Sequence, residues 1–231
     1  MISGMRIGTW NLDGQWSMAH DVFMQKQACD VWLLTEVPGD ISLQGYTQHL
    51  SQEIMLKGKH WAGVFSLLPL RLVPLDDPHP ASAAAIVGGT TFVSSILPWR
   101  TCGSDWPWVG ATTAEKTRST LDDLLKHLPR HNLVWGGDWN HSLEGSESAG
   151  SYDGREMIEG ALKELDLWAP TEQLNHRLHG VKSIDHLAVS RQRPSSRAKH
   201  LPAVLDDGTE LSDHDAYVVD IASRSESSRP I

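Results

Sequence analysis

Polar segments spread from residue 11 to residue 214 each lie where a run of strand-like residues begins or ends. Their side chains are carboxylates, amides and imidazoles, contributed by Asn11, Asp13, Glu36, Asp138, Asn140, Asp185, His186, Asp213 and His214. A charged group at the end of a largely apolar strand lies at the rim of a sheet, where a ligand can reach it. A chain that gathers all of these segments at one rim must form a single core, because independent halves would divide the group between two domains.

This set of side chains suits the hydrolysis of phosphoesters. The anionic oxygens of a phosphoester repel a nucleophile, so a catalyst needs a cation on those oxygens and a group that positions the attacking water. Carboxylates hold such a cation, while Asn and His side chains can contact phosphate. The pattern therefore predicts one metal-assisted site for phosphoester cleavage.

The composition is that of a globular chain without a broad basic surface. Its 231 residues, 40% of them hydrophobic, fit one large domain, which we expect to span residues 1–222. Residues 223–231 are mostly Ser, Arg and Pro and predict a flexible tail. The net charge of -9 argues against nucleic-acid binding through a broad basic face, although bound divalent ions would offset part of this charge.

Cysteine content and hydropathy predict a cytoplasmic chain. There are only two cysteines, and no apolar signal segment precedes the first strand-like run. No apolar run approaches the roughly 20 residues that a membrane-spanning helix needs. No feature of the sequence indicates an obligate protein partner.

Strand-like runs alternate with three segments of helical period. The predicted strands are residues 6–10, 31–35, 61–68, 71–75, 83–87, 91–97, 132–135, 184–189 and 216–221. The predicted helices are residues 17–28, with Met18, Val22 and Phe23 on one side, 112–128, with a capping box at Thr112 and Glu115, and 156–165, with Asp153 as N-cap. Consecutive strands in the middle of the chain imply antiparallel pairing. This order favours sheets packed face to face with helices outside, an α+β sandwich.

The motifs, taken in order, resemble the endonuclease/exonuclease/phosphatase family, whose members include DNase I-like nucleases. They are RIGTWNLDG at residues 6–14, Glu36 after an apolar strand, GDWN at 137–140, SIDH at 183–186 and SDH at 212–214. Any one of them is weak evidence, whereas the ordered set is specific. The resemblance implies a four-layer α/β/β/α sandwich of two mixed β-sheets flanked by helices, with the site at one end and Mg²⁺ or Mn²⁺ as cofactor.

The same resemblance assigns the metal ligands. Glu36 is expected to be the principal ligand, with Asp213 and Asp13 contributing directly or through water. Oxygen ligands of this kind suit Mg²⁺. The alternatives are that Asp13 only forms a turn with Gly14 and that Glu36 is a solvated loop residue.

The remaining motif residues take catalytic roles by resemblance. Asp138 would orient or deprotonate the attacking water, and Asn140 and Asn11 would position the phosphate or the nucleophile. His214 would donate a hydrogen bond to the phosphoryl oxygen, with Asp185 fixing its ring. We expect His214 to be protonated near neutrality, because an adjacent carboxylate favours the charged form.

Substrate contacts are predicted from residues outside these motifs as well. Many relatives carry a His or Tyr at the end of the strand before the long helix, and Arg100 can supply the missing phosphate contact here. Trp99 lies in a loop where aromatic rings can stack on unpaired bases, or can instead pack beneath the loop. Trp139 can line either the pocket or the core.

Three functions follow from this sequence. The first is a metal-dependent nuclease that cleaves DNA or RNA by in-line attack of water. The second is a phosphomonoesterase acting on a small phosphorylated molecule or a lipid headgroup. The third is an inactive binding module of the same fold, against which the full set of ligands argues. We favour the nuclease.

Overall fold

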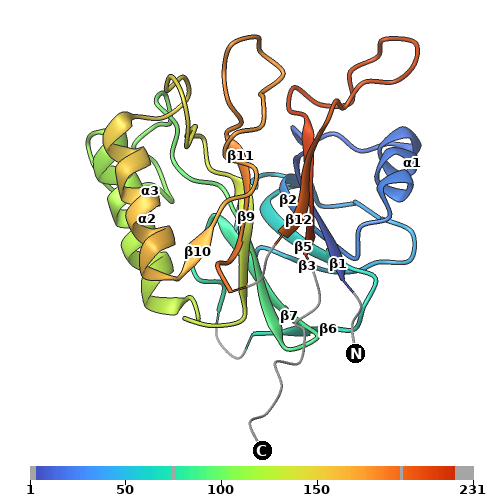
Figure 1. Ribbon diagram of the computed structural model, residues 1–231, viewed down its shortest axis with the longest axis horizontal. Coiled ribbons are helices and arrows are strands. Elements are labelled where there is room, and N and C mark those ends of the chain that lie inside the picture. The colour runs from blue at the N-terminus through green and yellow to red at the C-terminus, as the bar shows by residue number, and fades with distance from the viewer. Residues whose placement is uncertain (1–3, 74–75, 193–194, 222–231) are drawn as a thin grey trace, which may run out of the picture.

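Two mixed β-sheets pack face to face, with helices on their outer faces (Figure 1). The computed structural model describes residues 4–73, 76–192 and 195–221. The predicted tail at 223–231 lies outside the described residues. None of the described helices is long and apolar enough to cross a membrane.

The first sheet has seven strands, in the order β12-β13-β1-β2-β5-β3, with β4 paired to β5. Their bounds are β1 (Met5–Asn11), β2 (Val31–Pro38), β3 (Thr47–Leu50), β4 (Ile54–Leu56), β5 (Lys59–Ser66), β12 (Ser195–Leu201) and β13 (Ala216–Ile221). β1 and β2 run parallel, and the other neighbours are antiparallel.

The second sheet has six strands, in the order β10-β11-β9-β8-β7-β6. Their bounds are β6 (Leu70–Leu72), β7 (Ser82–Val87), β8 (Thr90–Ser95), β9 (Leu133–Asp138), β10 (Leu167–Trp168) and β11 (Asp185–Ser190). β8 and β9 run parallel, while the other pairs are antiparallel. The predicted antiparallel pairing in the middle of the chain is confirmed for β6, β7 and β8.

Three layers of apolar side chains separate four layers of structure. β2 shows why: alternate side chains of a strand point to opposite faces, so Leu33 enters the core between the sheets, whereas Trp32 and Leu34 enter the core under α1 (Met18–Gln27). The third core, around Trp135, lies between the second sheet and the helices α2 (Thr113–His127) and α3 (Tyr152–Glu164). The predicted four-layer sandwich is confirmed.

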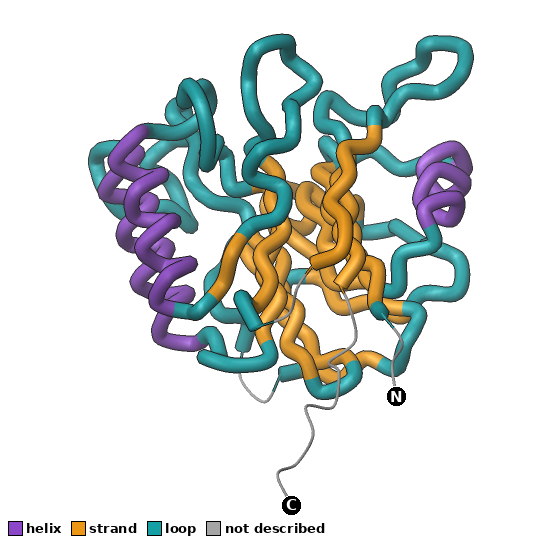
Figure 2. Tube along the Cα trace, in the orientation of Figure 1, coloured by secondary structure: helices purple, strands orange, loops and turns teal. Residues whose placement is uncertain are grey.

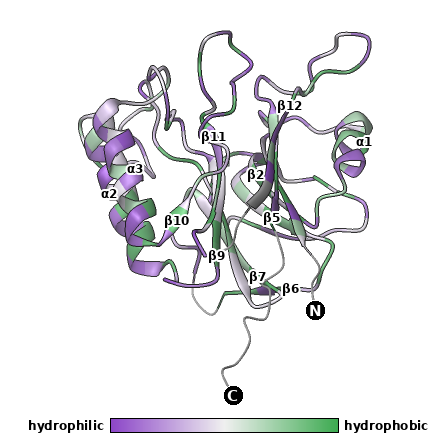
Figure 3. Ribbon diagram, viewed as in Figure 1, coloured by the Kyte–Doolittle hydropathy of each residue, from purple (hydrophilic) through white to green (hydrophobic). Residues whose placement is uncertain are grey.

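The helices bury one face each, and the N-cap of α3 differs from the sequence prediction. Figure 3 shows hydrophilic and hydrophobic residues alternating along α2 and α3, as surface helices require. The predicted capping box of Thr112 and Glu115 is present. The N-cap of α3 is Ser151 rather than Asp153, because the Ser151 hydroxyl accepts from the backbone N–H of Gly154.

The buried face of α1 also differs from the prediction. Met18 and Val22 are 83% and 60% exposed, whereas Phe23 packs partly buried against the core under α1 as predicted, and the fully buried side chains are His20 and Met24. His20 stacks on Trp10, and its two ring nitrogens bond to the Ser17 hydroxyl and the Leu211 carbonyl. Hydrogen bonds to both ring nitrogens offset the cost of burying His20, which allows the helix to turn this side inward.

The polar segments gather at one end of the sandwich. β1, β2 and β9 extend beyond their predicted ends to Asn11, Pro38 and Asp138. Asp138 lies opposite Asp185 in the antiparallel pairing of β9 with β11. The long loops between β10 and β11 and between β12 and β13 rise from this same end (Figure 2).

Candidate active site

Asn11 connects the two sheets at the rim. Its side-chain amide donates to Glu36 Oε1 at 3.2 Å and to Asp138 Oδ2 at 3.0 Å, and the residue is 1% exposed. One NH₂ group therefore brings the carboxylates of β2 and β9 within two hydrogen-bond lengths of each other. The predicted positioning role of Asn11 is consistent with this placement.

Glu36 projects from an irregular point in β2. Its φ of 49° is in the left-handed region, which costs energy for a residue with a Cβ and often marks a functional position. Its second carboxylate oxygen, Oε2, accepts from the Lys59 ammonium at 2.8 Å. Glu36 is therefore held in place from both sides.

The backbone conformation at Gly137 and Asn140 orients the side chains of Asp138 and Asn140. Gly137 has a φ of 125°, and a Cβ on it would lie 2.2 Å from the carbonyl oxygen of Ser95, so only glycine fits. Asn140 has a φ of 53°; its N–H donates to Asp138 Oδ1 at 3.0 Å and its side-chain amide to the Leu97 carbonyl at 3.0 Å. These bonds fix Asp138 with its Oδ2 facing Asn11.

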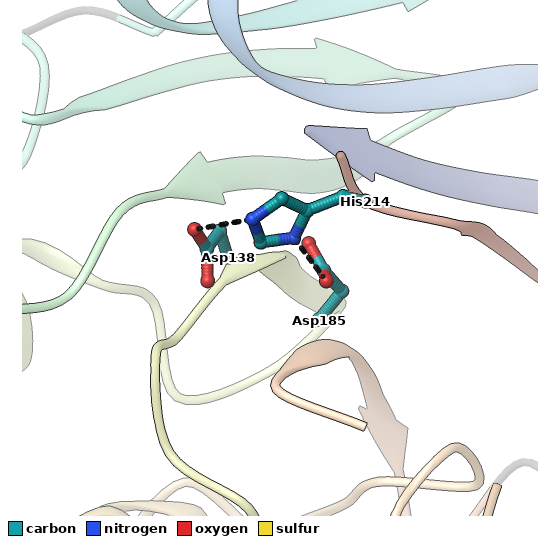
Figure 4. A group of neighbouring side chains, drawn as sticks. All are labelled: Asp138, Asp185 and His214. Carbon is teal, nitrogen blue, oxygen red and sulfur yellow. Dashed lines mark hydrogen bonds and ion pairs between the residues drawn. The ribbon is translucent and has the colours of Figure 1, made fainter. Parts of the chain in front are cut away.

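His214 lies between two buried carboxylates (Figure 4). Its Nδ1 is 2.8 Å from Asp185 Oδ2, and its Nε2 is 4.0 Å from Asp138 Oδ2. Asp138 and Asp185 are 3% and 1% exposed. Asp185 Oδ1 is buried and has no hydrogen-bond partner among the described residues.

Residues of the flanking motifs hold His214 in this position. The Ser212 hydroxyl donates to the Asn11 carbonyl at 2.7 Å and accepts from the His214 N–H, and the Trp10 indole donates to the His214 carbonyl at 3.0 Å. The motifs at residues 10–11 and 212–214 are thus bonded to each other. Sequence reasoning gave Ser212 and Trp10 no role.

Burial and charge shift the pKa values of this group. Burial raises the pKa of Asp138 to about 7, and the nearby Asp185 charge adds to the rise, partly opposed by His214. Burial alone would lower the pKa of His214, but the charges of Asp185 and Asp138 outweigh it and raise the pKa to about 10. At neutral pH His214 is therefore a cationic hydrogen-bond donor.

One group of three side chains and the separate carboxylate of Glu36 are candidate ligands for a divalent cation. The ligand atoms of Asp138, Asp185 and His214 all lie within 4.8 Å of one another. However, a protonated imidazole has no lone pair to give a metal, and His214 Nδ1 already bonds to Asp185. The Glu36 carboxylate, which accepts from Asn11 and Lys59, offers oxygen, the ligand atom that Mg²⁺ and Mn²⁺ prefer. Glu36 therefore suits such an ion better than His214 does.

The other two predicted metal ligands flank this group. Asp13, with a φ of 49°, donates its N–H to Asn11 Oδ1 at 2.9 Å, and its carboxylate accepts from Gln15. The Asp213 carboxylate is 69% exposed and lies 3.9 Å from His214 Nε2. Both residues thus adjoin site residues along the chain, and their roles as ligands stay predictions.

The predicted substrate residues have different surroundings. Arg100 is exposed, and its Nε donates to the Gly150 carbonyl at 3.3 Å. Trp99 packs partly buried against the core between the sheets, edge-on to Trp108. Trp139 is fully buried, with its ring centroid 4.3 Å from that of Trp135. The structure therefore assigns Trp139 to the core rather than to substrate contact, because its large apolar ring fills the space beneath α2 and α3.

A groove of about 830 Å³ lies next to the group of Asp138, Asp185 and His214, with Asp215, the chain neighbour of His214, in its wall. His176, which lines it, has its ring centroid 6.3 Å from that of His214. Arg177 crosses between the two loops that form the groove, donating to the Ser212 carbonyl at 2.7 Å and pairing with Glu210. Sequence reasoning missed these residues, because no motif marks the segments 175–180 and 200–210.

Comparisons with known proteins identify the fold through solved structures. No protein-family model matches the chain, and no curated protein does. Among solved structures, the endonuclease domain of TRAS1, a telomere-specific non-LTR retrotransposon, superposes with a TM-score of 0.67 and 17% identity over 95% of this chain and 98% of that one. AP endonuclease LMAP from Leishmania major gives 0.68 and 14% over 96% and 88%.

A third structure carries the family name itself. The endonuclease/exonuclease/phosphatase from Beutenbergia cavernae has a TM-score of 0.65 and 17% identity, covering 96% of this chain and 72% of that one. Identities this low establish the fold and leave the activity open. The chain has the fold of the endonuclease/exonuclease/phosphatase family, which confirms at the level of fold the resemblance seen in its sequence.

Proposed function

We propose that this protein is a divalent-metal-dependent nuclease that hydrolyses a phosphodiester by in-line attack of water. The observation that carries the proposal is the buried group in which His214 lies between Asp138 and Asp185 and Asn11 joins Asp138 to Glu36. This group combines a proton acceptor, a cationic donor and an oxygen ligand within hydrogen-bonding reach. Metal-assisted hydrolysis of a phosphoester can use these three parts together.

Each side chain has a role that its geometry permits. Asp138, once ionised, accepts a proton from the water that attacks phosphorus opposite the leaving oxygen. His214 donates from Nε2 to a non-bridging oxygen as negative charge builds, while Asp185 holds the ring through Nδ1. Glu36 would hold the divalent ion, whose charge lowers the repulsion between phosphate and nucleophile. Asn11 and Asn140 keep the carboxylates in place.

The groove beside His214 has room for a polymeric substrate. Its wall carries Arg177 paired with Glu210 and His200 hydrogen-bonded to Asp215, together with His179 and Leu178, which is 60% exposed. Apolar and hydrogen-bonding groups side by side suit contacts with the bases of a nucleic-acid strand. Arg100 and Trp99 stay proposed contacts on the other side of the site.

A panel of substrates tests this function. The purified chain, with Mg²⁺ or Mn²⁺, would be assayed on plasmid, single-stranded DNA, RNA, an abasic duplex and a set of phosphomonoesters, with Asp138→Asn as the blank. Cleavage of a nucleic acid by the wild type alone is the expected result. Turnover confined to the monoesters would replace the nuclease with the phosphatase, and no turnover on any substrate would contradict both.

Replacing the proposed metal ligand should weaken metal dependence. Glu36→Gln keeps the shape of the side chain but removes the charge that attracts the cation. The Mg²⁺ concentration for half-maximal rate should rise by about tenfold or more, since a neutral amide is a poorer ligand than a carboxylate. A Mg²⁺ titration of the initial rate measures this, and an unchanged midpoint would refute the assignment.

The pKa shifts predict how the rate depends on pH. The reaction needs Asp138 ionised and His214 protonated, so kcat/KM should rise as pH increases towards about 7 and fall as pH approaches about 10. A bound cation favours the ionised form of Asp138 and moves the rise in kcat/KM to lower pH. Asp185→Asn should lower the pKa of His214 and so move the fall in kcat/KM to lower pH. A rate that falls steadily between pH 5 and 8 would contradict the assignment.

A further inference from the structure

Lys59 holds Glu36 from the neighbouring strand. β5 begins at Lys59, which lies opposite Pro38 in the pairing of β2 with β5. From there the side chain reaches back to Glu36, and its ammonium donates to Oε2 at 2.8 Å. The side chains of Lys59 and Glu36 are only 20% and 21% exposed, so the ion pair is partly shielded from water. Such a pair is stronger than one on the open surface.

Gly14 makes room for this side chain. A Cβ on Gly14 would lie 2.2 Å from Lys59 Cε and 2.8 Å from its Nζ, so any larger residue would push the lysine aside. Gly14 also donates its N–H to the Glu36 carbonyl at 2.9 Å. The turn after Asp13 therefore holds the Glu36 backbone and leaves a path for Lys59 across it. The ion pair therefore packs against the turn that carries Asp13, one of the predicted metal ligands.

The ammonium and a divalent cation would use the same carboxylate. Glu36 Oε1 accepts from Asn11 and Oε2 from Lys59, so both oxygens already have donors. A cation that binds Glu36 must take the place of a donor or share its oxygen, and it is repelled by an ammonium so close by. Lys59 thus opposes the ion while it holds the ligand in position.

We propose that Lys59 is a built-in counter-ion of Glu36, with which a divalent cation must compete for the carboxylate in order to bind. This inference rests on the metal site of the proposed function. In this role Lys59 is a positioning residue that weakens metal binding to the protein alone. The displaced ammonium remains at the rim of the site, where its charge can be offset by a phosphate of the substrate.

The test is the affinity of the protein for Mn²⁺ without substrate. Lys59→Met removes the charge and keeps the length of the side chain. By calorimetry or by the electron paramagnetic resonance of free Mn²⁺, this variant should bind the ion about fivefold more tightly than the wild type. Lys59→Gln should behave in the same way, so a folding defect in one variant leaves the other to decide. Thermal unfolding confirms that each variant is folded.

A matched control separates this effect from a change in net charge. Lys57→Met removes an exposed positive charge two residues away and should leave the affinity for Mn²⁺ unchanged. If Lys59 only supported the shape of Glu36, its loss would weaken binding or leave it unaltered, and either result overturns the inference. If the wild type and all variants fail to bind Mn²⁺, the metal site of the proposed function is itself contradicted.

Discussion

Asp138→Asn is expected to lower kcat by about a thousandfold or more on any substrate that the wild type cleaves. The variant loses the proton acceptor for the attacking water, and an amide cannot replace it. The Asn140 N–H can keep an oxygen acceptor on the new side chain, whereas the Asn11 amide then meets an NH₂ group, so the fold should stay intact at a cost of about 1 kcal/mol. Steady-state kinetics would measure kcat, and circular dichroism of the same preparation would show whether the variant is folded.

The stability of this variant gives a second measurement. The pKa of Asp138 is raised to about 7, so between pH 4 and 7 the folded protein binds more protons than the unfolded chain. The contribution of Asp138 to the free energy of unfolding therefore falls as pH rises through that range. The Asp138→Asn variant should thus compare more favourably in stability with the wild type at pH 8 than at pH 5. Asp122→Asn, an exposed change on α2, is the matched control for kcat and stability.

A large loss of stability together with the loss of activity would contradict this account of Asp138. In that case the carboxylate would be needed for folding rather than for proton transfer. Full activity in Asp138→Asn would remove the residue from the mechanism altogether.

His214→Ala should lower kcat by about a hundredfold to a thousandfold, the usual effect of removing one donor to a developing negative charge. Asp185→Asn should have a smaller effect, because His214 remains but loses the charge that keeps it protonated and oriented. The double variant should be little slower than His214→Ala alone, since Asp185 acts through His214.

Comparison of the three rates decides whether the pair acts as a unit. Multiplicative effects of the two single changes would mean that Asp185 acts independently of the ring, for instance as a metal ligand through its unpaired Oδ1. Wild-type activity in His214→Ala would remove the proposed donor.

The sequence predicted the rim of the site because strand ends carry recognisable polar residues. The apolar runs before Glu36 and Asp138 define buried strands, and each motif follows such a run directly. Short-range bonds within the motifs, such as the one from the Asn140 N–H to Asp138, are also local in sequence. This local information sufficed for the order of the motifs and for the layers of the sandwich.

Other features depend on contacts that no local pattern encodes. Lys59 reaches Glu36 only because β5 pairs with β2 in one register. The buried side of α1 is set by partners of His20 as distant as Leu211. Trp139 lies inside a site motif, yet the packing beneath α2 and α3 takes its ring into the core. Each of these depends on residues that meet only in the folded chain.

The most direct test of the central claim is the rate of phosphodiester hydrolysis by protein stripped of metal and then titrated with Mg²⁺ or Mn²⁺. The assembled site predicts no measurable hydrolysis after stripping and a saturable recovery as either ion is added. A rate that persists unchanged in excess chelator would contradict a metal-assisted site at this end of the sandwich.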